Sequence, residues 1–181
     1  MKLIDLFEQQ QIIKGNVRIP VHIPTLVRYK HKGIPIVGAK VLGNFDCHYT
    51  KIESLEGGPS WVGGDFDCSY TSIESLEGGP SWVGKDFDCH YTEIPSLHNV
   101  HKQIEFIGGI LHLPVIDSHI LGVMFIKGLK EISISEIVYT DRNSKVIQVI
   151  KIINKHLGGD RNIHDAQEQL IEAGLAEFTK L

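Results

Sequence analysis

The chain is poor in the residues and motifs that mark several common classes of protein. Only three of its 181 residues are cysteines, and an odd count argues against a disulfide framework. No apolar run approaches the roughly 18 residues that a membrane span requires. The opening residues, MKLIDLFEQQQ, mix acidic and amide side chains into an apolar pattern, which is unlike a secretory signal. We therefore expect a cytoplasmic protein with no membrane partner.

Motifs of the common enzyme classes are also missing. The sequence has no G-x-S-x-G segment, no P-loop and no dinucleotide-binding fingerprint. Cys47-His48 and Cys89-His90 are chain neighbours, but strand neighbours point to opposite faces and cannot pair as nucleophile and base. A zinc site needs converging thiolates, and a single inward row of cysteines does not converge. We expect no enzyme activity, no cofactor and no metal site.

Repetition is what the sequence has in abundance. Segment 44–99 reads NFDCHYTKIESLEGGPSWVGG, then DFDCSYTSIESLEGGPSWVGK, then DFDCHYTEIPSLHN. Residues of one kind recur every 21 positions, at Phe45, Phe66 and Phe87, at Cys47, Cys68 and Cys89, and at Leu55, Leu76 and Leu97. A fixed period of this length is typical of a solenoid, in which each turn presents the same buried face to its neighbour.

The apolar spacing inside one repeat narrows the class. Phe66, Cys68, Thr71, Ile73 and Leu76 follow the leucine-rich-repeat pattern L-x-L-x-x-N-x-L-x-x-L, with Phe for the first Leu and Thr for Asn. The rest of the repeat, EGGPSWVGG, contains too much Gly and Pro for a helix. We expect that side of each turn to be extended or turn-like.

The repeats resemble the short bacterial type of leucine-rich repeat, and the wording SLEGGPxxVGGDFDC is similar to repeats of small bacteriophage-encoded proteins. The resemblance is best over residues 34–97. It implies an α+β fold: a short right-handed leucine-rich-repeat solenoid with a parallel sheet, an N-terminal cap and a C-terminal helical cap. It also implies a factor in the host cytoplasm that binds a host or defence protein. Thr50, Thr71 and Thr92 depart from the family, so its usual buried Asn ladder is not expected.

The N-terminal part, residues 1–40, is predicted to be a cap. Apolar residues at helical spacing favour a short helix over 2–12. Proline-rich sequence follows and excludes a long helix. The repeat register extends weakly backwards, with Ile34 at the Leu55 position, and predicts a degenerate first turn.

The solenoid is predicted to cover residues 41–129, regular over 41–97 and irregular over 98–129. The irregular part is strongly apolar and punctuated by Gly and Pro. Counting on in register places Ile104 at the Val62 position.

A strand and a two-helix cap are predicted for residues 130–181. Asp141 or Asn143 can cap the first helix, and Asp160 or Asn162 the second. Packing on the last turn is the expected task of these helices, because a solenoid must cover its final apolar face.

Charge is distributed unevenly over the chain. The net charge of −4 divides into +5 over residues 1–40, −8 over 41–97 and −1 over 98–181. An acidic repeat block disfavours contact with phosphate backbones. We therefore expect no nucleic-acid partner.

Strand alternation predicts which side chains the repeats display. Equivalent residues of neighbouring strands lie about 4.8 Å apart, so they should stack in ladders. The predicted outward ladders are Asn44, Asp65 and Asp86; Asp46, Asp67 and Asp88; His48, Ser69 and His90; and Tyr49, Tyr70 and Tyr91. These twelve residues are the candidate partner-binding site.

Three interpretations of this face stay open. The first is a solvated surface copied by repeat duplication, the second a docking face for a basic protein with Tyr as rigid anchors, and the third a site for a divalent cation such as Ca²⁺. Against the cation, carboxylates on straight strands lie in a line, and no loop wraps them into a cage.

Trp61 and Trp82 form a candidate secondary surface. Either they cover the backbone of the Gly-Gly corner, or they make an apolar contact surface or dimer interface. The sequence thus predicts a non-enzymatic protein-binding module with a basic protein partner. The alternatives are a structural, self-assembling component and a divalent-cation-binding repeat protein.

Overall fold

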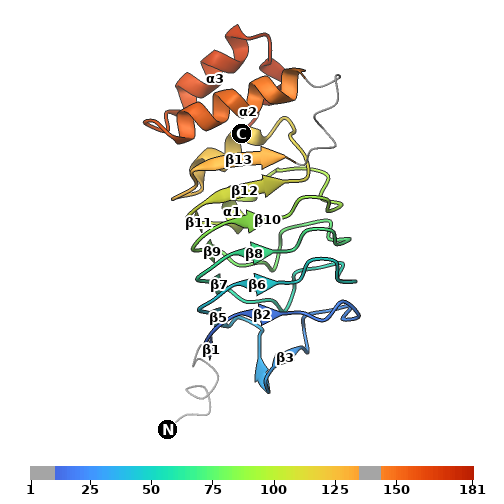
Figure 1. Ribbon diagram of the computed structural model, residues 1–181. Helices are drawn as coiled ribbons and strands as arrows, with labels where there is room; N and C mark the ends of the chain where they lie inside the picture. The colour runs from blue at the N-terminus through green and yellow to red at the C-terminus, as the bar shows by residue number, and fades with distance from the viewer. Residues whose placement is uncertain (1–10, 135–143) are drawn as a thin grey trace, which may run out of the picture.

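The computed structural model describes residues 11–134 and 144–181, and its short strands form two parallel sheets (Figure 1). Sheet A contains, in spatial order, β1 (Ile12–Ile13), β5 (Lys40–Val41), β7 (Trp61–Val62), β9 (Trp82–Val83) and β11 (Phe106–Ile107). Sheet B contains β13 (Glu131–Ile134), β12 (Ile110–Leu113), β10 (Phe87–Asp88), β8 (Phe66–Asp67), β6 (Phe45–Asp46) and β2 (Val17–Arg18). The predicted α+β class with parallel β-structure is confirmed.

The 21-residue period sets the strand register. Phe45 pairs with Phe66 and Phe66 with Phe87 in sheet B, while Val62 pairs with Val83 in sheet A. We call one circuit of the chain through both sheets a pass, and the passes together the stack. Each pass of the regular repeats adds one strand to each sheet. Sheet A arises from the Gly- and Pro-rich part of the repeat, for which the sequence predicted extended structure.

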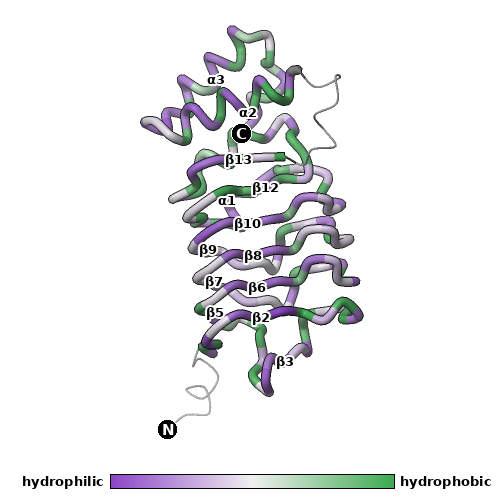
Figure 2. Tube along the Cα trace, in the orientation of Figure 1, coloured by the Kyte–Doolittle hydropathy of each residue, from purple (hydrophilic) through white to green (hydrophobic). Residues whose placement is uncertain are grey.

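The core lies between the two sheets and consists of the residues that recur. Figure 2 shows hydrophobic and hydrophilic residues alternating along each pass. The Phe rings stack, with centroids 5.5 Å apart for Phe45–Phe66 and 4.8 Å for Phe66–Phe87. The recurring Cys, Ile, Leu and Val side chains complete it, among them Cys47, Cys68, Cys89, Ile52, Ile73, Leu55, Leu76, Val62 and Val83.

The recurring threonines bond within their own pass. Thr50 Oγ1 donates to the Cys47 carbonyl at 2.7 Å, and Thr71 Oγ1 to the Cys68 carbonyl at 2.6 Å. Thr92 makes the same bond in the third repeat. A hydroxyl thus satisfies a buried carbonyl at the corner where sheet B ends.

The first pass is longer than the rest because it contains an antiparallel hairpin. Strands β3 (Lys30–His31) and β4 (Ile34–Pro35) pair with each other and with neither large sheet. The assignment of Ile34 to the Leu55 position is therefore wrong. Leu26 holds that position, because its side chain lies under Gly58 as Leu55 lies under Gly79.

A second insertion follows the third repeat. Helix α1 (Val100–Gln103) lengthens that pass, so that Ile107 rather than Ile104 pairs with Val83. The assignment of Ile104 to the Val62 position is corrected accordingly. The segment predicted to be irregular nevertheless supplies β11 and β12 to the two sheets and then the 3₁₀ helix η2 (Ile120–Phe125).

The helix predicted over 2–12 falls almost wholly outside the described residues. Its last position, Ile12, belongs to strand β1 and pairs with Lys40, so the helical prediction is wrong there. The chain then turns at Gly15, whose φ of +85° is a conformation that glycine adopts without strain.

Two helices pack on the C-terminal end of the stack, α2 (Ser144–Leu157) and α3 (Ile163–Glu172), followed by the 3₁₀ helix η4 (Ala176–Phe178) (Figure 1). Asn162 caps α3 by accepting the His164 and Asp165 amides. Asp141 and Asn143 lie outside the described residues.

The last strand of sheet B is closed by a side chain of α2. The Asn154 amide accepts from Ile132 N at 2.8 Å and donates to Ile132 O at 2.9 Å. Both bonds satisfy groups on the free edge of β13, where another strand would otherwise pair. Among the described residues, no helix is both long and apolar enough to cross a membrane.

We predict that Thr71→Val lowers the free energy of unfolding by about 1 kcal/mol, because it keeps the side-chain shape and removes one buried hydrogen bond. Urea denaturation of the full chain measures the change. Ser72→Ala, at the exposed neighbouring position, is the control and should stay within about 0.5 kcal/mol of wild type. Equal effects of the two changes would show that the Thr71 bond contributes no stability.

Candidate functional site

The first predicted ladder is half-buried and bonds successive passes to one another. In what we call the Asx ladder, Asn16, Asn44, Asp65 and Asp86 each accept with Oδ1 the backbone N–H of the next pass. The donors are Asn44, Asp65, Asp86 and Ile110, at 2.9, 3.1, 3.3 and 2.8 Å. Asn44 also donates to Asp65 Oδ2 at 3.0 Å. Asn44, Asp65 and Asp86 therefore join successive passes, and hydrogen bonds within the stack already engage their side chains.

Glycine makes room for this ladder. A Cβ at Gly64 would overlap Asn44 Oδ1, and Gly43 and Gly109 stand in the same relation to the ladder residues beside them. The third repeat has Lys85 at this position. The bond beside it, from Asp86 N to Asp65 Oδ1, is the longest of the four at 3.3 Å.

The second ladder, which we call the aspartate row, consists of Asp46, Asp67 and Asp88 in register on β6, β8 and β10. Each Oδ1 accepts the backbone N–H two residues on, at 3.2, 2.9 and 3.1 Å. The carboxylates are partly exposed, with side-chain exposures of 27%, 34% and 24%. At one end Arg18 Nε lies 3.6 Å from Asp46 Oδ2.

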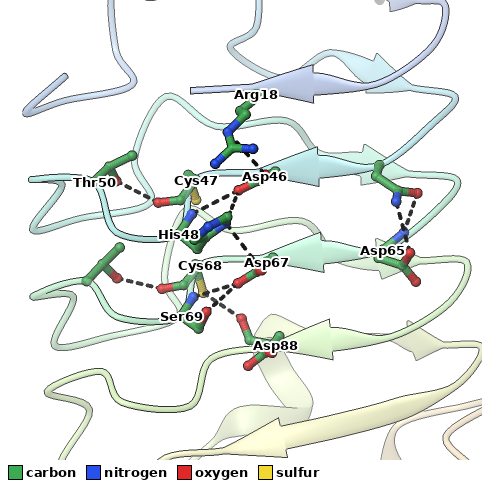
Figure 3. Close-up of polar contacts among 12 residues, drawn as sticks. Arg18, Asp46, Cys47, His48, Thr50, Asp65, Asp67, Cys68, Ser69 and Asp88 are labelled. Carbon is green, nitrogen blue, oxygen red and sulfur yellow. Dashed lines mark hydrogen bonds and ion pairs between the residues drawn. The ribbon is translucent and has the colours of Figure 1, made fainter. Parts of the chain in front are cut away.

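The third ladder is only half displayed. The His48 and His90 rings contact the aspartate row through Nδ1, with His48 2.5 Å from Asp46 Oδ1 and His90 against Asp88 Oδ1 (Figure 3 shows His48). Ser69 was predicted to face outward, and this is wrong: it is 3% exposed and donates to Asp67 Oδ1 at 2.6 Å. The small hydroxyl folds back onto its own carboxylate.

The fourth ladder, the tyrosine stack, is the most unusual feature of the surface. Tyr49, Tyr70 and Tyr91 all have left-handed backbone conformations, with φ of 53°, 53° and 52°. Such a conformation is a genuine outlier for a bulky residue and costs of order 1–3 kcal/mol. The rings stack face to face at 4.3 and 4.5 Å, and Tyr49 and Tyr70 are 57% and 39% exposed.

The tyrosine stack is fixed from the side by the histidines. His48 meets Tyr49 edge-on at 5.3 Å, and His90 meets Tyr70 and Tyr91 edge-on at 5.1 and 4.7 Å. Desolvation between neighbouring rings, followed by hydrogen bonding to Tyr49, raises the pKa of Tyr70 to about 12. The aspartate row, the two histidines and the tyrosine stack thus form one contiguous surface, which we call the tyrosine–aspartate face.

Trp61 and Trp82 lie on sheet A, away from this face. Their rings stack at 4.5 Å, and Trp82 stacks on Phe106 at 4.8 Å. Both tryptophans are partly exposed, while Lys40 Nζ lies 5.8 Å from the Trp61 ring. The rings cover one another's faces and offer their edges to a partner.

Within residues 11–134 and 144–181, one group of side chains could hold a metal ion. A donor atom each of Asp46, His48 and Asp67 lie within 4.8 Å of one another. Calcium prefers six to eight oxygen ligands, so a set containing imidazole suits a transition metal better. Three donors fall short of the four of a closed zinc site.

The cysteines are built into the core. Cys68 Sγ lies 3.3 Å from Asp88 O, and Cys89 Sγ lies 3.1 Å from His112 O, as hydrogen-bond donors. Burial, and secondarily the nearby charges, raise the pKa of the Cys68 thiol well above its usual value. These thiols are poor nucleophiles and poor metal ligands.

Sequence reasoning missed a second acidic surface, which we call the glutamate groove. It is lined by Glu53, Glu56, Glu74 and Glu77 with Ser54, Ser75 and Gly78. The 21-residue spacing of its glutamates was a visible signal. It was overlooked because the loop part of the repeat was taken only as a connection.

Comparisons with known proteins add no family. No family model matches the chain, and neither the curated proteins nor the solved structures include a significant match.

We predict that Gly64→Ala lowers the free energy of unfolding by about 1–3 kcal/mol, because the added methyl group must displace Asn44 from the Asx ladder. Lys85→Ala, at the equivalent position that already carries a Cβ, is the control and should change it by less than about 0.5 kcal/mol. Urea denaturation measures both. A tolerated Gly64→Ala would mean that the ladder shifts freely.

A second prediction concerns alkaline pH. An unfolded tyrosine ionises near pH 10, whereas the pKa of Tyr70 is about 12. The unfolded chain loses this proton first, so the free energy of unfolding falls between about pH 10 and pH 12. Tyr70→Phe should show a shallower fall in that window and a wild-type slope from pH 7 to 9, as measured by urea denaturation. Identical slopes above pH 10 would contradict the prediction.

Proposed function

We propose that this protein is a leucine-rich-repeat solenoid that acts as a non-enzymatic protein-binding module through its tyrosine–aspartate face. One observation carries the proposal: three tyrosines, two of them exposed and one half-buried, are held stacked in a strained backbone conformation. Backbone outliers that persist in a fold point to functional sites more often than to chance.

The tyrosine stack has the properties of a binding anchor. Tyrosine is enriched among residues that dominate interface energies, because it offers a large apolar ring and a polar hydroxyl. Here the rings are already immobilised by stacking and by His48 and His90. Binding would therefore cost little side-chain entropy, which otherwise takes about 0.5–1.5 kcal/mol per ordered side chain.

The aspartate row indicates the charge of the partner. Three carboxylates lie in register at adjacent strands, where like charges repel. Within the described residues, Arg18 is the one Lys or Arg side chain that pairs with the row. A basic protein surface would relieve this repulsion and could contact the tyrosines beside the aspartate row. Attraction between the opposite charges would also speed association.

The same geometry favours binding over catalysis. Asp46 orients His48 as in a catalytic pair, but a general base also needs a nucleophile within hydrogen-bond reach. Ser69, which stands at the position of His48 in the next repeat, could be a candidate nucleophile, but it is buried and donates its hydroxyl to Asp67. In line with the family resemblance, we propose a phage-encoded factor in the host cytoplasm whose partner is a host or defence protein.

The cation-binding alternative keeps one supporting observation, the cluster of Asp46, His48 and Asp67. If the cluster holds an ion, zinc should raise the melting temperature of the wild type and leave that of His48→Ala unchanged. The self-assembling alternative rests on the partial exposure of the stacked Trp61 and Trp82.

The proposal predicts that Asp46→Asn, Asp67→Asn and Asp88→Asn together weaken partner binding at least about tenfold, since attraction to a basic surface is lost. Asparagine keeps the Oδ1 acceptor, so the backbone bonds of the row survive. The partner is first captured from bacterial lysate on wild-type protein, identified and purified. Its affinity for each variant is then measured by calorimetry.

The matched control is Glu105→Gln, Glu168→Gln and Glu172→Gln, which removes the same charge from exposed positions elsewhere. It should bind like wild type. A second variant changes all three tyrosines to Asn, a residue that tolerates the left-handed conformation, and should also lose binding. Equal affinity of all variants would place the contact elsewhere and overturn the proposal.

A further inference from the structure

The hairpin of the first pass is an addition to the regular repeat, and its strands pair with neither large sheet. It replaces the short turn that the regular repeats make between Leu55 and Ser60, and it projects beyond the end of the sheets at β3 (Figure 1). Its turn residues, Lys32 and Gly33, have φ of 50° and 83°. Such a turn favours Asn or Gly at both positions, so a lysine there is not the most stable choice.

Positive charge is concentrated on this hairpin, which we call the basic hairpin and define as residues 27–37. Between Gln11 and Phe45 the chain has six Lys and Arg and no Asp or Glu. Arg28, Lys30 and Lys32 are all exposed. None of the three pairs with an acidic group among the described residues.

The basic hairpin is nevertheless held in place. Ile36 is fully buried, and Ile34 and Tyr29 pack against the core. Tyr29 Oη also donates to the Arg18 carbonyl at 3.5 Å. Exposed Val27 and Val37 stand at its base, 48% and 55% accessible. The charges are therefore presented on a fixed support beside a small apolar surface.

The glutamate groove is its electrostatic complement. The carboxylates of Glu53, Glu56, Glu74 and Glu77 are exposed, and within the described residues none of them forms an ion pair. Their backbones are fixed by serine, because Ser54 Oγ accepts Glu56 N at 3.0 Å and Ser75 Oγ accepts Glu77 N at 3.1 Å. The groove is thus a rigid acidic surface without a cation.

Hairpin and groove lie along one edge of the molecule. A Cβ at Gly57 would overlap Val27 Cα, so the hairpin begins directly beneath the pass that carries Glu56. From there the hairpin extends away from the stack (Figure 1), whereas the groove is lined by residues of the next two passes, Glu53 and Glu56 from one and Glu74 and Glu77 from the other. The hairpin therefore cannot reach the groove of its own chain.

We propose that two copies of this chain associate antiparallel about a two-fold axis, each placing its basic hairpin in the glutamate groove of the other. A two-fold arrangement forms both contacts at once and closes the assembly as a dimer. Three cations then face four carboxylates in each contact, and Val27 and Val37 are covered. This surface is separate from the tyrosine–aspartate face, so the inference does not depend on the proposed function.

A second copy suits the hairpin better than a nucleic acid does. A phosphate backbone that reached Arg28, Lys30 and Lys32 would run on toward the acidic passes above and be repelled there. The second copy instead offers negative charge where the hairpin lies and positive charge where the groove lies.

A charge-swap experiment on the full chain tests the dimer. Lys30→Glu with Lys32→Glu changes the hairpin charge from +3 to −1, and Glu53→Lys, Glu74→Lys and Glu77→Lys together change the groove charge from −4 to +2. Sedimentation equilibrium should show that either variant alone dissociates with a constant raised at least about tenfold, since like charges then face each other. An equimolar mixture of the two variants should regain the wild-type constant, because both contacts become complementary again.

Controls separate charge pairing from loss of structure and from other partners. All variants should keep the wild-type circular dichroism, and the wild-type dimer should weaken from about 0.05 to 0.5 M salt as the Debye length shortens. A monomeric wild type at low salt overturns the proposal, as does a dimer indifferent to both reversals. Tight binding of duplex DNA that Lys30→Glu with Lys32→Glu abolishes, with no dimer, would assign the hairpin to nucleic acid instead.

Discussion

Every residue in the repeats must be compatible with its own copy one pass away. Strands pair in register, so Phe45 lies on Phe66 and Asp46 beside Asp67. This constraint selects side chains that interact favourably with themselves. Aromatic rings stack, and amide or carboxylate oxygens accept the backbone N–H of the next pass. Rows of side chains that interact favourably with one another hold the passes together. Rows whose side chains do not bond to one another are left able to interact with another molecule.

The aspartate row is such a surface. A carboxylate cannot donate to its neighbour, so each Asp accepts from its own backbone instead, and the carboxylates of neighbouring passes lie side by side without a bond between them. The Asx ladder shows the alternative outcome for the same residue type: Asp65 and Asp86 are stabilised because backbone donors meet them. Aspartate thus has two roles. Just before a strand, as Asp86, it accepts a backbone N–H of the next pass, and within a strand, as Asp67, it accepts one of its own pass. The tyrosine stack and the aspartate row combine a conformational cost with an electrostatic one at a single place on the surface.

The sequence predicted the parallel strands and the inward Phe and Cys rows, which the 21-residue period determines, and the C-terminal helices, for which it offers capping residues. Two assignments of residues to repeat positions failed where an insertion interrupts the 21-residue spacing. Ile34 and Ile104 matched apolar positions by chance, because an insertion leaves no mark on a pattern that any aliphatic residue can satisfy. Ser69 was misplaced because in–out alternation was carried past Asp67, where the strand already ends. The Asx ladder was missed because an acidic residue was assumed to face solvent, although Gly43 and Gly64 before it were a readable sign of close approach.

The two ends of the stack differ in structure. At the C-terminal end Asn154 bonds to the free edge of β13, and at the N-terminal end the first pass contains the hairpin insertion. Neither of these features contacts the pass that begins at Asp65. Removing residues 65–85, or inserting another copy of them, would therefore leave both ends and every row intact. Gene duplication can therefore lengthen or shorten the stack by one repeat at a time, and the tyrosine–aspartate face becomes longer or shorter with it.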